Sequence, residues 1–337
     1  MARNKDRLMK RIFVLVLTIV LLVLPVLVRN DQFLLSTIII AGIYCLYAVS
    51  LRFVFLADVW LVGPAAFSAI GAYGVTFLMR AAGLSYWLCL PLVGVSVVII
   101  ALGFGYITIR VRGMYFAILS MAFIEVIRLT LVDTLGTHMV LTVPALNPII
   151  IPHLFVIDFT SRVSYYYFIL ALFLITLVIL YKVERLPFGT NLKAVAQSEL
   201  LAESIGINVV WHKVSALCIG AFFIGITGCF FAAYTHTISP QSFTVGGSMI
   251  VLILMVVGGI GSIWGPVIGA TVLTIIPEYL NVGPVIQNSI YAVFVILTLY
   301  FLPSGLISLP QVIQGKAWWQ KTREARAKML ARIRRGF

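Results

Sequence analysis

Charged residues are scarce in this chain of 337 residues, where Asp, Glu, Lys and Arg together make up only 10%. Soluble domains contain about 25% charged residues. Hydrophobic residues make up 62% of the chain, and its mean hydropathy is +1.10. So few charges cannot cover the surface of a water-soluble fold of this length. The composition therefore excludes a soluble protein and indicates an integral membrane protein.

Acidic residues are rarer still, with 11 against 24 basic residues and a net charge of +13. Most of the basic excess lies in two short segments. Residues 1–11 contain five basic residues and one acidic residue, and residues 315–337 contain eight and one. The apolar region between them offers no basic surface with base-reading side chains, so we expect no nucleic acid partner.

Motifs for metal, redox and nucleotide chemistry are also missing. The cysteines stand singly in apolar runs without CxxC spacing, which excludes a disulfide framework and a zinc site. They are Cys45, Cys89, Cys218 and Cys229. The sequence contains no G-x-x-x-x-G-K-S/T phosphate loop, so we do not expect this chain to hydrolyse nucleotide itself. We expect no cofactor, no bound metal and no enzymatic activity.

Long apolar stretches dominate what remains. A transmembrane helix needs about 20 apolar residues, and ten stretches approach that length: 12–28, 33–51, 57–79, 85–109, 113–131, 164–181, 214–234, 245–259, 262–280 and 286–302. The third contains Asp58 and Pro64 and the eighth is short, so either could be broken or re-entrant. The sequence thus predicts an all-α integral membrane protein with about ten transmembrane helices, in a range of eight to ten.

The first stretch is read as a retained span, because Arg29-Asn30-Asp31-Gln32 follows it in place of a small-residue cleavage site. If the N-terminus is cytoplasmic, 20 of the 24 basic residues fall on the inner side. Only Arg29, Arg80 and Arg162 fall outside, and Arg128 lies within a span. Positive-inside sorting therefore predicts that the N- and C-termini are both cytoplasmic.

Three regions follow from this topology. They are a cytoplasmic basic tail (1–11), a transmembrane domain (12–306) and a second cytoplasmic tail (307–337). The last tail combines Trp318 and Trp319 with basic residues, a composition typical of an amphipathic helix on anionic lipid; a disordered basic tail is the alternative.

The inner loop, residues 182–213, carries a pattern of its own. Pro187-Phe188-Gly189-Thr190 reads as a break, an amphipathic helical pattern follows over 191–205, and Gly206 ends it as a C-cap glycine. Such a helix suits docking in a groove of a cytoplasmic partner. The alternative is a connector that lies on lipid headgroups.

Six segments occur in a recognisable order along the chain. They are AAFSAIGAY (65–73), RVRGMYFAILSMAFIEVIRL (110–129), AVAQSELLAESIGIN (194–208), ISPQSF (238–243), MVVGGIGSIWGPVIGA (255–270) and FLPSGL (301–306). Together they resemble the permease subunits of branched-chain amino acid ABC importers, over about residues 35–306. The third segment resembles the loop through which such permeases are coupled to their ATPases.

The resemblance implies half of a translocation pathway in the bacterial cytoplasmic (inner) membrane, for branched-chain or related hydrophobic amino acids. The implied partners are a second homologous permease subunit, two cytoplasmic ATP-binding subunits, an extracytoplasmic solute-binding protein and the lipid bilayer. The implied residues of coupling to the ATPase are Leu192, Ala194, Ala196, Glu199, Ala202, Glu203 and Gly206.

The chain departs from this family at two places. Trp60-Leu61-Val62-Gly63-Pro64 stands where the family has Ser-Leu-Gly, and LGTHMVLTVPAL (135–146) replaces a glycine-rich outer loop. The resemblance implies that both lie near the substrate route or its outer mouth, so urea, amides and aromatic acids stay open as substrates. An ion-coupled secondary transporter is the other alternative, although the chain offers few intramembrane carboxylates for it.

Small and polar residues inside the spans suggest further roles. The predicted pathway residues are Ser68, Gly71, Tyr73, Phe116, Ser120, Ser248, Gly258 and Gly259. Glu125 and Arg128, three residues apart on one helix face, are expected to pair inside the membrane. Two stripes of small residues at every fourth position, 221/225/229 and 261/265/269, predict close helix packing.

Overall fold

A computed structural model describes residues 25, 31–142 and 162–308, except for positions 109, 112, 237, 281–282 and 303–304. Most of the first apolar stretch, the N-terminal tail, nearly all of the C-terminal tail and most of the outer loop lie outside the described residues.

The described chain is helical, with no strand among its assigned elements. The helices are α2 (Gln32–Phe55), α3 (Ala65–Ala81), α4 (Tyr86–Thr108), α5 (Met114–Thr142), α6 (Arg162–Arg185), α7 (Pro187–Gln197), α8 (Glu199–Ser204), α9 (Val209–Thr235), α10 (Val245–Gly258), α11 (Trp264–Tyr279) and α12 (Pro284–Phe301), with single 3₁₀ turns at Pro240–Ser242 and Leu306–Ser308. Six helical segments are long and apolar enough to cross a membrane, and shorter apolar helices accompany them. The prediction of an all-α integral membrane protein is therefore confirmed.

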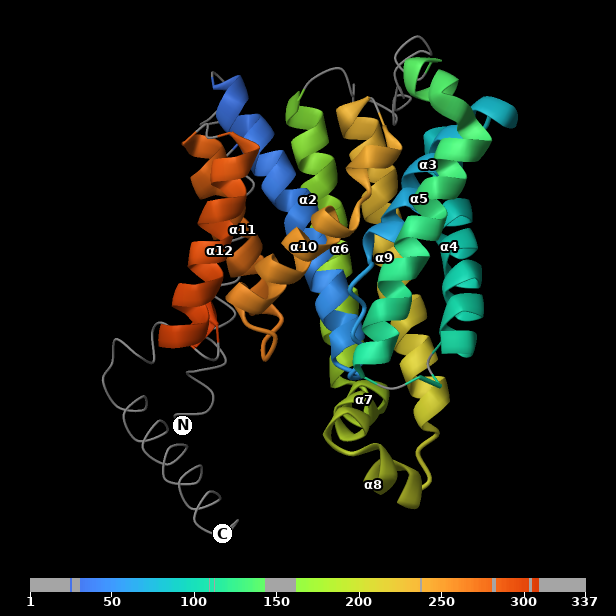
Figure 1. The fold of residues 1–337 in the computed structure, drawn as a ribbon, viewed down its shortest axis with the longest axis vertical. Coiled ribbons are helices and arrows are strands. Elements are labelled where there is room, and N and C mark those ends of the chain that lie inside the picture. The colour runs from blue at the N-terminus through green and yellow to red at the C-terminus, as the bar shows by residue number, and fades with distance from the viewer. Residues whose placement is uncertain are drawn as a thin grey trace.

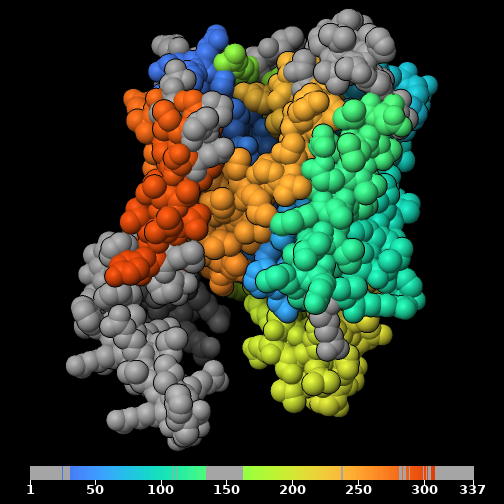
Figure 2. All heavy atoms as spheres, viewed as in Figure 1, coloured from blue at the N-terminus to red at the C-terminus, as the bar shows by residue number. Residues whose placement is uncertain are grey.

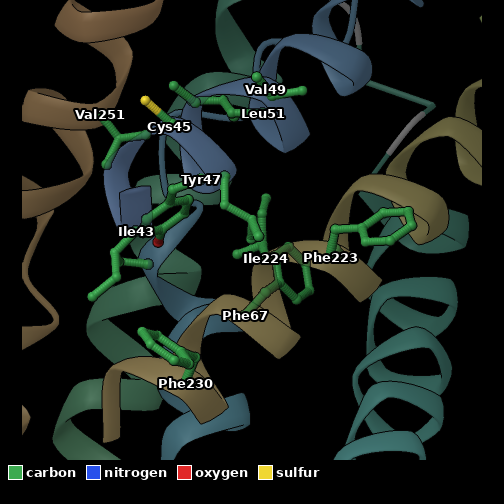
Figure 3. Close-up of a cluster of buried hydrophobic side chains, with 14 of the residues drawn as sticks. Ile43, Cys45, Tyr47, Val49, Leu51, Phe67, Phe223, Ile224, Phe230 and Val251 are labelled. Carbon is green, nitrogen blue, oxygen red and sulfur yellow. The ribbon is translucent and has the colours of Figure 1, made fainter. Parts of the chain in front are cut away.

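The two most buried long helices, α2 and α9, organise the bundle (Figure 1). Helices α3 and α4 pack along α9, while α6 and α11 pack along α2. The core lies where α2, α3 and α9 meet, and Figure 3 shows Tyr47, Phe67, Ile224 and Phe230 gathered there. On the outside, α5 carries exposed apolar side chains such as Ile118, Val126 and Leu129. Figure 2 shows this helix (green) running along the outer surface of the bundle. Helices that satisfy their own backbone hydrogen bonds and expose apolar side chains are typical of a bundle that faces lipid.

Helices α3 and α9 approach each other at backbone distance. A Cβ atom at Gly71 would collide with the Gly225 carbonyl, and one at Gly228 with the Ser68 carbonyl. The Cys229 thiol donates to the Gly71 carbonyl oxygen at 3.3 Å. The predicted 221/225/229 stripe is thus confirmed as a close-packing surface of α9.

The second predicted stripe is correct only in part. Gly265 and Gly269 on α11 face the backbone of α10, where a Cβ would collide with Gly259 and Leu254. Gly261 precedes α11 in the turn between the two helices and has open space around its Cα. The helix begins only at Trp264, so the helical spacing assumed for Gly261 does not apply there.

The third apolar stretch begins with non-helical backbone, whereas the eighth is one continuous short helix, so the prediction of a break is correct only for the third. Residues 56–64 form a non-helical connection, mostly buried, that leads from the end of α2 to α3. Asp58 has a positive φ of 56° in its opening turn, and Pro64 directly precedes the first residue of α3. Helix α10 has 14 residues and follows a non-helical segment with a 3₁₀ turn at Pro240–Ser242.

The inner loop differs from its predicted form in two respects. Pro187–Thr190, read as a break, is the first turn of α7, because proline at the first helical position supplies the required φ and needs no hydrogen-bond acceptor. The single helix predicted over 191–205 is two helices, since Ser198 is extended and caps α8 by accepting from the Leu201 N–H. Gly206, with a φ of +85°, ends α8 as predicted.

The α3–α9 contact yields a test of the fold. Replacing Gly71 by Leu should lower the free energy of unfolding by about 1–3 kcal/mol or more, since the new side chain must displace α9 backbone. Gly103→Leu is the matched control, because Gly103 on α4 is exposed with no atom near its Cβ position. Thermal unfolding in detergent should separate the two, and equal unfolding temperatures would contradict this packing.

Candidate functional site

The α7–α8 segment (187–204) projects from one end of the bundle, at the bottom of Figure 1. Its first anchor is His212 at the start of α9. The His212 ring stacks on Phe188 with centroids 5.5 Å apart. Its Nδ1 lies 2.8 Å from the Asn208 carbonyl oxygen and its Nε2 lies 3.3 Å from Asn191 Nδ2. A neutral ring that donates from Nδ1 and accepts at Nε2 satisfies both contacts.

A second anchor holds α8. Lys213 Nζ, on α9, lies 2.6 Å from Glu199 Oε1, and the Lys213 side chain is only 7% exposed. Val195, Ala202 and Val209 form a small buried cluster beneath it. The Lys213–Glu199 ion pair, the stacking of His212 on Phe188 and the small apolar cluster together attach the two short helices to the end of α9.

This mounting divides the predicted coupling residues into buried and accessible ones. Leu192 and Ala202 are fully buried, so they hold the segment in place and cannot contact a partner directly. Ala194 and Glu199 are half-buried, while Ala196, Glu203 and Gly206 are exposed.

Three exposed apolar residues were not among the predicted coupling residues. Leu200, Leu201 and Ile205 are 71%, 69% and 73% exposed, and we call them the α8 apolar surface. All three are apolar positions of the amphipathic pattern. The direction in which they point could not be predicted, because the predicted helix over 191–205 is broken at Ser198 and α8 takes its own orientation. The signal available in the sequence was the presence of paired leucines in a segment otherwise rich in polar residues.

A second group of predicted residues converges on the α2–α3 connection (56–64). The Ser120 hydroxyl, on α5, accepts the backbone N–H groups of Val62 at 3.0 Å and Gly63 at 3.2 Å. It donates to the Ala117 carbonyl at 2.7 Å. The Ser248 hydroxyl, on α10, accepts the Ala65 N–H at 3.2 Å. Both serines are fully buried, so their hydroxyls satisfy backbone that would otherwise lack partners inside the bundle.

The first of the two departures from the resembled family, Trp60–Pro64, lies in this connection. A Cβ at Gly63 would collide with the Ser120 carbonyl, so the glycine allows the connection to lie directly on α5. Trp60 is half exposed and donates from Nε1 to Asp58 Oδ1 at 2.8 Å. The connection thus has a buried edge on α5 and an exposed edge at Asp58 and Trp60.

Most of the other predicted pathway residues have their contacts elsewhere, although Ser68, in the first turn of α3, donates its N–H to the Pro64 carbonyl at 3.4 Å. Ser68 and Gly71 belong to the α3–α9 contact. Tyr73 packs against Phe243, and Phe116 against Phe104. Gly258 and Gly259 lie at the end of α10. The predicted set therefore does not form one continuous lining in this conformation, and its role in transport stays a prediction.

A cavity of about 110 Å³ lies elsewhere, between α2, α6 and α11. Ile38, Cys45, Ile169, Phe173 and Thr271 are among its lining residues, and none of the predicted pathway residues lines it. The predicted contact between Glu125 and Arg128 is present, with Arg128 Nε 2.8 Å from Glu125 Oε2 and both side chains partly exposed. The place of this pair inside the membrane stays a prediction.

Six long apolar helices, a buried non-helical connection between α2 and α3 and a pair of short helices at one end identify a polytopic membrane protein. Irregular backbone at membrane depth is tolerated only where protein or a wet cavity surrounds it. The model of a family described as "Branched-chain amino acid transport system / permease component" matches residues 33–303. The chain belongs to this family.

Curated relatives agree with that assignment. The chain is 28% identical over 330 residues to the high-affinity branched-chain amino acid transport system permease protein LivM of Salmonella typhimurium, covering 89% of this chain and 75% of the relative. LivM of Escherichia coli K12 is 26% identical over 328 residues, with the same coverage. A probable LivM of Methanocaldococcus jannaschii is 27% identical over 162 residues, 43% of this chain and 47% of the relative. No solved structure matches the chain.

The Ser120 contacts predict a specific loss of stability. Ser120→Ala leaves two buried N–H groups without an acceptor, each worth about 1–3 kcal/mol, so the unfolding temperature should fall clearly. Ser96→Ala is the control, because the Ser96 hydroxyl is exposed and bonds only to the Val93 carbonyl of its own helix. Equal thermal unfolding of the two variants would contradict the role given to Ser120.

Proposed function

We propose that this chain is the transmembrane permease subunit of an ATP-binding-cassette importer for branched-chain amino acids. The single observation that carries the proposal is family membership over residues 33–303. The α7–α8 segment supports the proposal. Its contacts with α9 hold it at one end of the bundle, where it can serve as a docking element.

The proposed complex contains a second homologous permease subunit, two ATP-binding subunits in the cytoplasm and a solute-binding protein outside. The relatives are named as components of transport systems, which supports a multi-subunit assembly. We further propose ten spans within residues 12–306, both termini in the cytoplasm and a location in the inner membrane. The basic residues support this orientation, because most of them then fall on the side of the α7–α8 segment.

In the proposed mechanism, ATP-driven closure of the ATPases displaces the α7–α8 segment. The α8 apolar surface supplies the contact, because Leu200, Leu201 and Ile205 would otherwise expose apolar area to water. The buried anchors at His212 and Lys213 carry the displacement into α9. Since α3 and α4 pack along α9, the bundle can then change from inward to outward access.

The proposed substrates are leucine, isoleucine and valine, as the names of the relatives suggest. The α2–α3 connection, the partner permease and the bilayer would together enclose the substrate route. Urea, amides and aromatic acids are the competing substrates, because the α2–α3 connection departs from the family pattern at Trp60–Pro64.

Uptake measurements test the energy source and the substrate together. Membrane vesicles from cells that express the complete transport system should take up radiolabelled leucine when the binding protein and ATP are supplied. Uptake should persist in the presence of a protonophore and stop when ATP is removed. Uptake that follows the proton gradient would instead support an ion-coupled secondary transporter, and competition by urea or phenylalanine but not valine would overturn the substrate assignment.

A substitution on α8 tests docking. Leu201→Asp should weaken association with the ATP-binding subunits about tenfold, because one exposed apolar contact is replaced by a charge. Thr190→Asp is the control: it adds the same charge to exposed α7 without removing an apolar side chain. Co-purification of the subunits measures the difference. Equal loss in both variants would show that charge, and not the α8 apolar surface, governs docking.

The exposed carboxylate of Glu203 and the glycine at 206 were also expected to act in coupling. Gly206 has a left-handed backbone, so any side chain there would strain the end of α8 as well as affect coupling. Leu201 is therefore the sharper position for a test.

A further inference from the structure

A buried arginine lies at the end of α2, outside every role assigned above. Arg52 belongs to the last turn of α2 and its side chain is only 2% exposed. Buried charges are costly unless they are paired and fully hydrogen-bonded. The partners of Arg52 therefore indicate why this position holds a cation.

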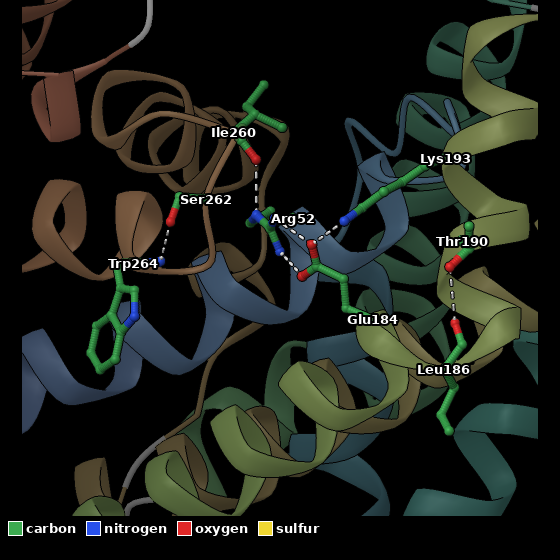
Figure 4. A network of polar contacts seen from close by, with 8 residues as sticks. All are labelled: Arg52, Glu184, Leu186, Thr190, Lys193, Ile260, Ser262 and Trp264. Atoms are coloured by element: carbon green, nitrogen blue, oxygen red, sulfur yellow. Dashed lines mark hydrogen bonds and ion pairs between the residues drawn. The ribbon is translucent and has the colours of Figure 1, made fainter. Parts of the chain in front are cut away.

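Two elements supply the partners of Arg52, and a third contacts the same carboxylate, as Figure 4 shows. The guanidinium binds Glu184 of α6 through two nitrogens, with Nη1–Oε2 at 2.8 Å and Nη2–Oε1 at 3.2 Å. Its Nε donates to the Ile260 carbonyl oxygen at 2.9 Å. Lys193 of α7 approaches the same carboxylate, with Nζ–Oε1 at 2.8 Å. Helices α2, α6 and α7 and the α10–α11 turn (259–263) thus meet at one guanidinium and one carboxylate.

The α10–α11 turn is itself tightly packed. Gly259 has a positive φ of 110°, and a Cβ at Gly258 would collide with the Gly265 carbonyl. Gly305 lies against the same two glycines with no room for a side chain. Because backbone packs directly against backbone here, we expect α10 and α11 to move together, as one hairpin.

The far part of this hairpin contacts the α2–α3 connection. Ser248, in the first turn of α10, accepts the Ala65 N–H where the connection enters α3. A displacement of the Ile260 end of the hairpin therefore also displaces the acceptor at Ser248. The hairpin therefore has one end at Arg52, near α7, and its other end at the α2–α3 connection.

We propose that Arg52 is a positioning residue that ties the α10–α11 hairpin to the α7–α8 segment, so that displacement of α7 moves Ser248 and the α2–α3 connection. This inference rests on the function proposed above and adds the link between docking and the pathway. The strong part of the link is the Arg52–Glu184 pair, which is bidentate and shielded from water. Lys193 is half exposed and contributes less.

The chemistry of arginine makes the proposal specific. A guanidinium can bind a carboxylate with two nitrogens and still donate to a carbonyl from the third. A lysine at the same position offers one compact ammonium group, which can hold Glu184 without the fixed geometry toward Ile260. Arg52→Lys therefore retains the charge and loses the defined three-way contact, whereas Arg52→Gln loses both the charge and the contact.

The first experiment measures ATP hydrolysed per leucine imported by the complete, reconstituted importer. Arg52→Lys and Arg52→Gln should raise that ratio about tenfold while ATP hydrolysis stays within about twofold of wild type. Arg185→Gln is the matched control, since Arg185 ends the same helix as Glu184 but is exposed and lies over the Tyr181 ring at 4.2 Å. Lys193→Gln should raise the ratio less than either Arg52 variant.

A second measurement remains informative if a variant imports nothing. Spin labels at Ser204→Cys and Gly261→Cys report the separation of α8 from the α10–α11 turn. Both positions are exposed, and Gly261 has open space for a side chain. The four native cysteines are buried, so labelling favours the introduced ones. The distance distribution should stay narrow when ATP is added to wild type and should broaden in Arg52→Gln.

The outcomes separate the two proposals. Absence of ATP-driven leucine uptake by wild type would overturn the proposed function. If wild type imports leucine with ATP, an unchanged ratio in both Arg52 variants overturns the positioning role. The same conclusion follows if the label distance in wild type broadens with ATP as much as in Arg52→Gln. Loss of folding in Arg52→Gln alone leaves Arg52→Lys and the wild-type distances to decide.

Discussion

Satisfying backbone polar groups inside an apolar bundle is the constraint on which the rest of this structure depends. Lipid offers no hydrogen bonds, so backbone that leaves the helical form must find acceptors within the protein. The α2–α3 connection does so through the hydroxyls of Ser120 and Ser248, which lie on two different helices. Interrupted backbone at this depth is therefore held by α5 and α10 together, and a movement of either helix alters its support.

In the α7–α8 segment, the residues that anchor it to the bundle differ from the residues that it exposes to solvent. Leu192 and Ala202 fix the α7–α8 segment from beneath, while Leu200, Leu201 and Ile205 face outward from it. Anchors on α9 join this segment to the core by one route, and Lys193 joins it by another through Glu184 and Arg52. A permease that is moved by a partner needs both properties, an accessible contact and a stiff connection behind it.

Sequence patterns predicted the long elements well, because burial in lipid requires uninterrupted apolarity and helical hydrogen bonding. They also located the non-helical backbone of the third stretch from Asp58 and Pro64, whereas the eighth stretch is short but continuous. They failed at short range in the inner loop. There, Pro187 begins a helix instead of preventing one, and Ser198 breaks a helix that its neighbours favour. The exact helix boundaries in this loop depend on its contacts with α9, and the loop sequence alone does not reveal those contacts.

The amino-acid sequence by itself determined the class of protein, the apolar helices, the close packing at Gly225 and Cys229, and the Glu125–Arg128 pair. Each of these follows from residues near one another in the chain, through composition, helical spacing or local charge. Only the tertiary structure decided that Ser120 and Ser248 converge on one connection, and that Arg52 joins Glu184 to Ile260. Those contacts link residues between 57 and 208 positions apart, and packing in three dimensions alone brings them within hydrogen-bonding distance.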